Sequence, residues 1–470
     1  RVGAGGRELG AAGVPELVAQ LKAVDAAARA PGHDAGALAG ERERLLAALD
    51  AGLEAGALRG GAGGAPAAAE EEDVLEPSPG GYYASLAASR PVTPSPRRPR
   101  RYDAPGGLPR VYVYDLPARF NAEQPRKYKR CATDQYGTEV WFHEVLSSSH
   151  LRTTDPDKAD FFYVPIYGEC YLWQHEMLRH VGRVESYKAT NDFFAEAVGM
   201  VERRWPFWNR TRGRDHVFVF PGARGPTIFN DWQARIGRSV FLTPEGDRKA
   251  HYFNTWKDVV IPGLEWDERL WGAQHRARLE DPRTAPPRTH LAYFRGTIDH
   301  REGWAYSRGL RPRLKAIFAN ATDVIYDTKK KDCDRGCYIE EMSRSVFCLN
   351  PLGWTPWTLR FYQAVMTRCI PVLIADDIEF PYESEVDYSR FALKLPEAGV
   401  DDIVEIMRGM PEEERERRRR AMDEVWKMFT YQRPPQEGDA FYSTMRELAR
   451  KKRASKTHPA AVTPWLARAG

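Results

Sequence analysis

The stretch from Ser345 to Asp377 carries residues suited to binding an anion. It is predicted to form a strand, a glycine-containing loop, a helix and a second strand that ends in an acidic turn. The helix begins near Thr358, and its free N–H groups and macrodipole attract negative charge. Arg360 lies in the first turn, where we expect it to be exposed, and it could give a diphosphate a bidentate clamp. A plain α/β crossover with a surface arginine explains the spacing equally well.

Two successive series of alternating strands and helices position these residues. The first series has expected strands at 110–115, 161–165, 216–220, 239–242 and 258–261, and helices around 140–146 and 191–203. The second has expected strands at 290–294, 324–326, 346–349 and 370–374, and helices at 310–318, 339–345, 359–366, 400–408 and 412–429. Such alternation is typical of parallel sheets, which bind ligands at the carboxyl ends of their strands. The sequence therefore predicts an α/β chain with two Rossmann-like lobes facing across a cleft.

Composition sets the limits of this organisation. The chain has 470 residues, 42% of them hydrophobic and 11% aromatic, so most of it can bury a core. Its net charge of +4 does not indicate a nucleic-acid partner. We expect a low-complexity stem with short helices and a linker at 1–105, lobes at 106–287 and 288–432, and a C-terminal helix and tail at 433–470. No apolar run is long enough to span a membrane.

The Ser345–Asp377 stretch resembles the C-terminal signature of exostosin-like enzymes, glycosyltransferase family 47. The residues that carry the resemblance are Phe347-Cys-Leu, Pro351-x-Gly353, Arg360, Cys369-Ile-Pro-Val and Asp377-x-Glu379-x-Pro381-Tyr382. Further matching motifs occur in the family's order at 111–117, 158–165, 214–218 and 294–296, so the resemblance covers 110 to about 445. The family often has Phe in place of Tyr382 and Gly in place of Arg368. The segments 254–258 and 306–310 look similar to plant and algal members, including the branch that arabinosylates extensin-like glycoproteins.

The resemblance implies a GT-B fold and an inverting transfer. The donor would be a nucleotide-sugar, in most relatives a UDP-sugar, and the acceptor a polysaccharide or a hydroxyproline-rich glycoprotein. The second lobe would bind the donor, with Gly353, Thr358 and Arg360 at its phosphates. Arg295 could reach the same phosphates or form an ion pair within the lobe. No cofactor and no essential metal are expected, because an arginine and a helix N-terminus can neutralise the leaving diphosphate.

Four acidic residues have roles that depend on this resemblance. Asp377 and Glu379 could accept hydrogen bonds from ribose hydroxyls, although Asp377 could equally cap a turn. An inverting transfer also needs a base on the acceptor hydroxyl, supplied by the first lobe. Glu169 follows the strand at 161–165 at its carboxyl end and is the first choice. Asp215, with the neighbouring His216, is the second choice, although both begin a strand, which favours a structural role.

Two alternatives to this interpretation remain at this stage. Asp332-Cys-Asp334 imitates the Asp-x-Asp motif with which GT-A transferases hold a divalent metal. Its polar loop, bracketed by Cys333 and Cys337, favours a disulfide-pinned turn instead. The other alternative is a carbohydrate-binding or scaffold protein that has kept the fold without catalysis. An oligomer with itself or with related transferases is a further expected partner.

Cysteines and glycosylation motifs point to a secretory compartment. The six cysteines form an even set, and Cys333 and Cys337 are expected to pair. Cys348 and Cys369 should be neighbours in the core, and a Cys131–Cys170 pair is also conceivable. Asn209 and Asn320 lie in Asn-x-Thr motifs, which accept N-linked glycans. We therefore expect a Golgi-lumenal protein, anchored in the membrane through a segment absent from this chain.

Overall fold

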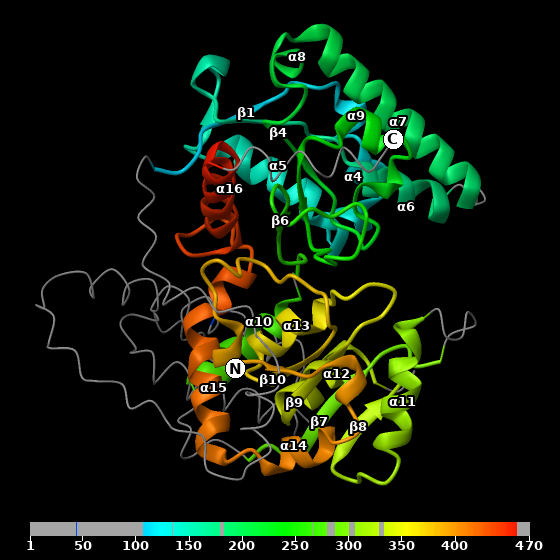
Figure 1. Cartoon of the computed structure of the whole chain (residues 1–470), viewed down its shortest axis with the longest axis vertical. Coiled ribbons are helices and arrows are strands. Elements are labelled where there is room, and N and C mark those ends of the chain that lie inside the picture. Colours follow the sequence, from blue (N-terminus) through cyan, green and yellow to red (C-terminus); the bar gives the residue numbers. More distant parts are fainter. Residues whose placement is uncertain are drawn as a thin grey trace, which may run out of the picture. The chain divides into compact units, whose positions relative to one another are not determined.

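The structure is a computed structural model that describes residues 107–133, 135–178, 183–265, 267–279, 287–299, 306–328 and 333–457, together with Arg44. The expected stem lies outside these residues apart from Arg44. Two parallel sheets with helices on both faces form the described part (Figure 1). This α/β architecture is the predicted two-lobe GT-B arrangement.

The first sheet has six parallel strands in the order β2-β1-β3-β4-β5-β6. Their bounds are β1 Val111–Val113, β2 Arg152–Thr153, β3 Phe161–Tyr163, β4 His216–Val219, β5 Val240–Thr243 and β6 Val259–Val260. The helices that follow them are α4 Gln124–Lys127, α5 Thr138–Ser148, α6 Gly168–Leu178, α7 Arg183–Arg204, α8 Phe207–Thr211 and α9 Trp232–Ile236. Successive strand residues face opposite sides, so Phe161 and Tyr163 pack with α5 while Phe162 packs with α7 and α8. Burial of both faces explains why the strands are continuously apolar.

The second sheet has five parallel strands in the order β11-β10-β9-β7-β8. Their bounds are β7 His290–Arg295, β8 Val324–Asp327, β9 Ser345–Pro351, β10 Ile370–Ile374 and β11 Leu393–Lys394. The associated helices are α11 Leu310–Ile317, α12 Arg335–Ser343, α13 Leu359–Met366, α14 Ile403–Gly409 and α15 Glu412–Val425. The strand order reverses between β9 and β7, and such a reversal is where open α/β sheets bind ligands.

Two helices pack on a different lobe from the elements that precede them in the sequence. Helix α10 (Glu268–Leu279) precedes the second sheet, yet its Leu270 and Ala273 pack against Ile339 and Met366 of α12 and α13 (Figure 1). The expected boundary at 287 had placed this helix with the first lobe. Helix α16 (Ala440–Thr457) returns to the first sheet, as expected, where it packs beside α5. Within the described residues, we find no helix with the length and apolarity to cross a membrane.

The lobes contact each other through the loops at the carboxyl ends of β5, β6 and β10. Asp247 forms an isolated antiparallel bridge with Ile378. The Glu379 amide donates to the carbonyl of Gly246 at 2.7 Å. On the other side, Gln363 of α13 donates to Glu265 at 2.6 Å. The carboxyl ends of both sheets therefore meet, so this junction is where groups from both lobes can act together.

Candidate functional site

Two buried arginines lie at the carboxyl ends of β7 and β9. Arg360 comes from the first turn of α13 and Arg311 from the first turn of α11. Both guanidinium groups lie over the Phe294 ring of β7, with their central carbons 4.3 and 5.2 Å from the ring centroid. Three neighbouring elements therefore bring two positive charges to one place.

Arg360 is buried rather than exposed, so the expected exposure was wrong. Its side chain is 8% exposed, because it folds onto Phe294 and donates through Nη2 to the Arg295 carbonyl at 2.7 Å. A Cβ atom at Gly296 would lie only 2.8 Å from Nη2, so the chain needs glycine there to admit the guanidinium. Arg360 Nε and Nη1 are buried without a hydrogen-bond partner in the described part of the chain. These two donors therefore lack a protein acceptor.

Arg311 was not singled out from the sequence, where it looks like any other basic residue of its helix. It is 6% exposed and donates to the carbonyls of Leu352, Thr297 and Pro351 at 2.9, 2.8 and 3.1 Å. Its guanidinium also donates to the Tyr306 hydroxyl. Burial, and next the positive charge of Arg360, lower the pKa of Arg311 to about 10.

The pair has no acidic counterpart. Within the described residues, no carboxylate lies within salt-bridge distance of Arg311 or Arg360, although nearly every other buried arginine of the second lobe has one. Two like charges buried together disfavour folding unless something neutralises them. The Thr358 hydroxyl accepts from the Arg360 amide at 3.4 Å and caps α13, whose N-terminus faces the same place. The arrangement suits a ligand with two negative charges, such as a diphosphate.

Arg295 and Gly353 border the arginine pair without adding a free charge. Arg295 forms a two-bonded ion pair with Glu341 of α12, at 2.5 and 2.6 Å, and lies 3.7 Å from Asp327. Of the two roles considered for Arg295, the structure has the ion pair within the lobe. A Cβ at Gly353 would lie 3.0 Å from Arg311 Nη2, so glycine allows this loop to pass close to the guanidinium.

Glu169 lies at the carboxyl ends of β3 and β4, as expected. It is 3% exposed, and its Oε1 accepts from Trp173 Nε1 of its own helix at 3.2 Å. The carboxyl group lies against Gly222, which follows β4. A second buried acid, Glu139 of α5, accepts from the amides of Glu169 and Cys170 at 3.3 and 2.8 Å and so caps α6. Burial raises the pKa of Glu139.

A different carboxylate, Glu245, lies at the junction of the lobes. It follows β5 at its carboxyl end and is fully buried. Oε1 accepts from the Asp247 amide at 2.9 Å, while Oε2 has no hydrogen-bond partner among the described residues. Burial raises the pKa of Glu245 to about 8, and the approach of the Thr355 side chain from the second lobe offsets only part of that effect. The sequence rule that favours Glu169 is a carboxylate just after a predicted strand. Glu245 satisfies the same rule, because it follows β5.

Comparison with known proteins agrees with this geometry. Residues 107–410 match the model of the Exostosin GT47 domain. The chain is 32% identical over 364 residues to a probable glucuronosyltransferase, GUT1, of Oryza sativa subsp. japonica, covering 74% of this chain and 82% of that protein. It is 32% identical over 362 residues to a probable β-1,4-xylosyltransferase, IRX10, of Arabidopsis thaliana, covering 74% and 84%.

The chain belongs to the exostosin family of glycosyltransferases, GT47. A moss relative, probable glucuronosyltransferase 47 A of Physcomitrium patens, is 32% identical over 363 residues. The predicted family, its GT-B fold and its glycosyltransferase activity are thereby confirmed. The names of these relatives refer to glucuronosyl and xylosyl transfer, and none of them tests the expected extensin-arabinosylating branch.

Asp377 and Glu379 lie apart from the arginine pair of this GT47 chain. Asp377 pairs with Lys249 at 2.5 Å. Glu379 accepts from the Thr255 hydroxyl and lies 3.5 Å from Arg248 and 3.8 Å from Lys451. Both acids, considered for ribose binding, thus contact the first lobe, and Glu379 also contacts α16.

Asp215 belongs to a network at the amino end of β4. It accepts from Thr211 at 2.5 Å and lies 2.8 Å from His216 Nδ1, while His216 Nε2 lies 2.7 Å from the Tyr114 hydroxyl. Burial lowers the pKa of His216. The amino edge of the sheet is opposite to the edge where the lobes meet, so this network joins β1 to β4 and lies away from the arginine pair.

The structure has three disulfides in this GT47 chain. They join Cys131 to Cys170, Cys333 to Cys337, and Cys348 to Cys369. Cys333, Cys337 and Glu341 lie close enough to hold a metal, but the two sulfurs are bonded to each other and are not thiolates.

The asparagines of the glycosylation motifs and Asp334 of the Asp-x-Asp imitation lie at the surface. The asparagines Asn209 and Asn320 are both exposed, in α8 and after α11. Asp332 lies outside the described residues. Asp334 caps α12 by accepting from the Cys337 amide at 2.9 Å. The described half of this motif therefore has a structural partner.

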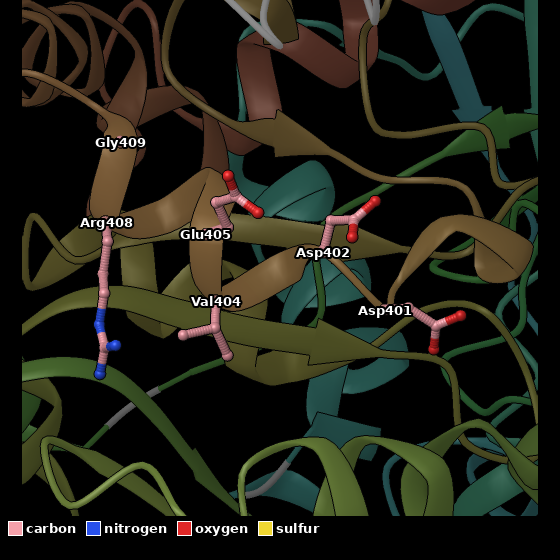
Figure 2. A pocket seen from close by; sticks show the side chains of 6 residues that line it. All are labelled: Asp401, Asp402, Val404, Glu405, Arg408 and Gly409. Atoms are coloured by element: carbon pink, nitrogen blue, oxygen red, sulfur yellow. The ribbon is translucent and has the colours of Figure 1, made fainter.

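A surface hollow lies on α14 (Figure 2), lined by Asp401, Asp402, Val404, Glu405, Arg408 and Gly409. Arg408 pairs with Asp323 at 2.9 Å, and Asp401 pairs with Arg313 at 2.6 Å. Asp323 precedes β8, so the hollow reaches the amino edge of the second sheet. The arginine pair lies at the carboxyl edge, and the hollow is therefore separate from the candidate site.

Proposed function

We propose that this chain transfers a sugar from a nucleotide-sugar, in particular a UDP-sugar, to a hydroxyl of a glycan or glycoprotein with inversion at the anomeric carbon. The single observation that carries the proposal is the pair of buried, uncompensated guanidinium groups of Arg311 and Arg360 beside the N-terminus of α13. A nucleoside diphosphate brings the charge and the acceptor oxygens that this place lacks.

The proposed reaction uses these groups on the leaving group. As the bond between the sugar and the diphosphate breaks, negative charge grows on the terminal phosphate. Arg360 Nε and Nη1 donate to it, and the α13 N-terminus adds its partial charge. Fixed donors of this kind stabilise the developing charge without a bound metal, so we propose that no metal is essential. Gly353 and Thr358 would border the phosphates, and Arg295 would orient its own carbonyl toward Arg360.

The donor sugar is a second part of the proposal. Because the relatives' names refer to glucuronosyl and xylosyl transfer, we propose UDP-glucuronate and UDP-xylose as the first donors to test, and UDP-arabinose as the test of the extensin-arabinosylating branch. The acceptor would be a polysaccharide or a hydroxyproline-rich glycoprotein, and an oligomer with related transferases remains a proposed partner.

We further propose that the enzyme works in the Golgi lumen. Three disulfides support an oxidising compartment, because the cytosol keeps thiols reduced. The exposed positions of Asn209 and Asn320 also allow glycans to be attached there.

Measuring UDP release from each donor, with pooled cell-wall oligosaccharides as acceptors and EDTA present, tests the proposal. We expect release with at least one donor, and an α or β linkage opposite to that of the donor by NMR of the product. Loss of transfer on adding EDTA would favour a GT-A-like, metal-dependent reaction. Absence of transfer from every donor, with no effect of UDP on the melting temperature, would favour the scaffold alternative.

A further inference from the structure

Within the described residues, no lysine or arginine forms an ion pair with Glu245, unlike the neighbouring acids of the second lobe. Glu379 and Glu385 each lie beside a lysine or arginine. The groups that act on Glu245 are the Thr355 side chain, the Asp247 amide and the like charge of Asp247, and no cation is among them. Burial, and next the negative charge of Glu245, raise the pKa values of Tyr252 in the first lobe and Tyr362 on α13. The carboxyl group therefore lies between the two lobes, without a partner for Oε2 in the described part of the chain.

The position of Glu245 relative to the arginine pair suits a reaction between them. Thr355, which the carboxyl group approaches, accepts through its carbonyl from the Gly353 amide at 3.0 Å. Gly353 borders Arg311. Only Trp354 lies between Gly353 and Thr355, so their Cα atoms lie at most about 7.6 Å apart. Arg311 and the Glu245 carboxyl group therefore border the two ends of the same three-residue loop.

We propose that Glu245 is the general base that accepts the proton of the acceptor hydroxyl, an inference that rests on the proposed function. The acceptor O–H bond breaks and its proton moves to Glu245 Oε2. The oxygen forms a bond to the anomeric carbon, and the bond from that carbon to the diphosphate oxygen breaks. The electron pair leaves with the nucleoside diphosphate, where Arg311 and Arg360 stabilise the charge.

Glu169, the base expected from the sequence, fits this role less well. Its carboxyl group contacts Trp173 and Gly222, both within the first lobe. A base must reach an acceptor oxygen that is itself in contact with the donor sugar. Glu245, in contrast, lies at the junction of the lobes and approaches Thr355 in a loop of the donor lobe.

The test uses the full chain with UDP-xylose or UDP-glucuronate, whichever the wild type turns over, and records kcat/KM from pH 6 to 9.5. With a pKa of about 8, the base is ionised in about a tenth of molecules at pH 7, so the wild-type rate should rise about tenfold toward a plateau above pH 8. A flat profile over this range overturns the proposal. This measurement needs no variant and is independent of folding effects.

Glu245→Gln should reduce kcat/KM at least a hundredfold while the Kd for UDP stays within threefold. Its melting temperature at pH 8.5 should exceed that of the wild type, because the amide removes a buried charge. Glu245→Asp should recover part of the rate and keep the rise with pH. A Glu245→Gln enzyme that retains more than a third of wild-type activity overturns the proposal. A variant whose melting temperature falls together with its rate also overturns it, because that result indicates that Glu245 stabilises the fold.

Glu385→Gln is the matched control. Burial also raises the pKa of Glu385, but it pairs with Arg446 of α16 at 3.0 Å. This variant should lose stability and keep its rate within threefold. If the wild type itself releases no UDP from any donor, the proposed function fails, and this outcome is distinct from loss of activity in Glu245→Gln alone.

Discussion

Replacing Arg360 by methionine removes the charge that the proposed reaction needs and keeps much of the side-chain volume. A helix N-terminus supplies only about half a unit charge, whereas a guanidinium adds a full charge and aligned donors at any working pH. Losing one such contact to a transition state costs on the order of 3 kcal/mol, or roughly a hundredfold in rate. We therefore expect kcat/KM of Arg360→Met to fall about a hundredfold. Arg360→Lys should recover only part, because the forked geometry is lost.

The same substitution should not destabilise the unliganded chain. The folded pKa of Arg311 is lowered to about 10, first by burial and then by Arg360. At one pH unit per 1.36 kcal/mol, keeping Arg311 charged costs about 3 kcal/mol, present in full at pH 7 and lost only above pH 10 to 12.5. Removing Arg360 relieves part of that cost. The lost bond to the Arg295 carbonyl offsets some of the gain, so the melting temperature should stay within a few degrees.

Thermal unfolding with UDP and EDTA measures both effects. A ligand at a hundred times its Kd stabilises the folded state by about 2.7 kcal/mol, so UDP should raise the wild-type melting temperature by several degrees. Arg360→Met should lose this shift. Arg313→Met is the matched control, because Arg313 lies on the outer side of α11 and pairs with Asp401 at 2.6 Å. Full transfer by Arg360→Met, or an unchanged UDP shift, would refute the assignment of the diphosphate site.

Three further substitutions test the structural assignments. Lys257→Met leaves the fully buried Asp258, now 2.5 Å from Lys257 Nζ, without its partner and should lower the free energy of unfolding by about 3–5 kcal/mol in urea titrations. Replacing both Cys348 and Cys369 by alanine opens a bridge over 21 residues and should lower it by about 3 kcal/mol, with wild-type kinetics below the melting temperature. Glutamine at each sequon asparagine should remove one glycan per site in secreted protein, as measured by intact mass.

The regular elements could be predicted where the signal is local. The bounds of α13 and β10 agree with the sequence expectation to the residue, because each is a continuous apolar or amphipathic run with a clear start. Helix α6 was missed because its cap is not local. The carboxylate of Glu139, about thirty residues earlier in the chain, accepts from its first amides, and no Ser, Thr, Asp or Asn precedes Gly168 to mark the start.

The site itself could be predicted only in part. The family motif predicted that Gly353, Thr358 and Arg360 lie near the carboxyl ends of the strands. It did not predict the burial of Arg360, because that depends on the Phe294 ring of another strand. Nothing in the sequence separates Arg311 from Arg313, two residues apart on one helix, since the difference lies in which side faces β9. Asp377 and Glu379 were assigned to ribose because the sequence does not show that the first lobe's loop after β5 contacts them.

Both halves of the site lower the stability of the folded chain at neutral pH, and this separates them from the surrounding ion pairs. The folded pKa of Glu245 is raised from 4.5 to about 8, so stability is lost as pH rises between these values, by about 3 kcal/mol at pH 7. Arg311 carries a similar cost with the opposite charge. Neutral isosteres at such positions should raise stability and lower the rate, whereas removing one member of a buried pair such as Arg295–Glu341 should lower stability. Movement of rate and stability in opposite directions is therefore the signature that distinguishes a residue retained for transfer from one retained for the fold.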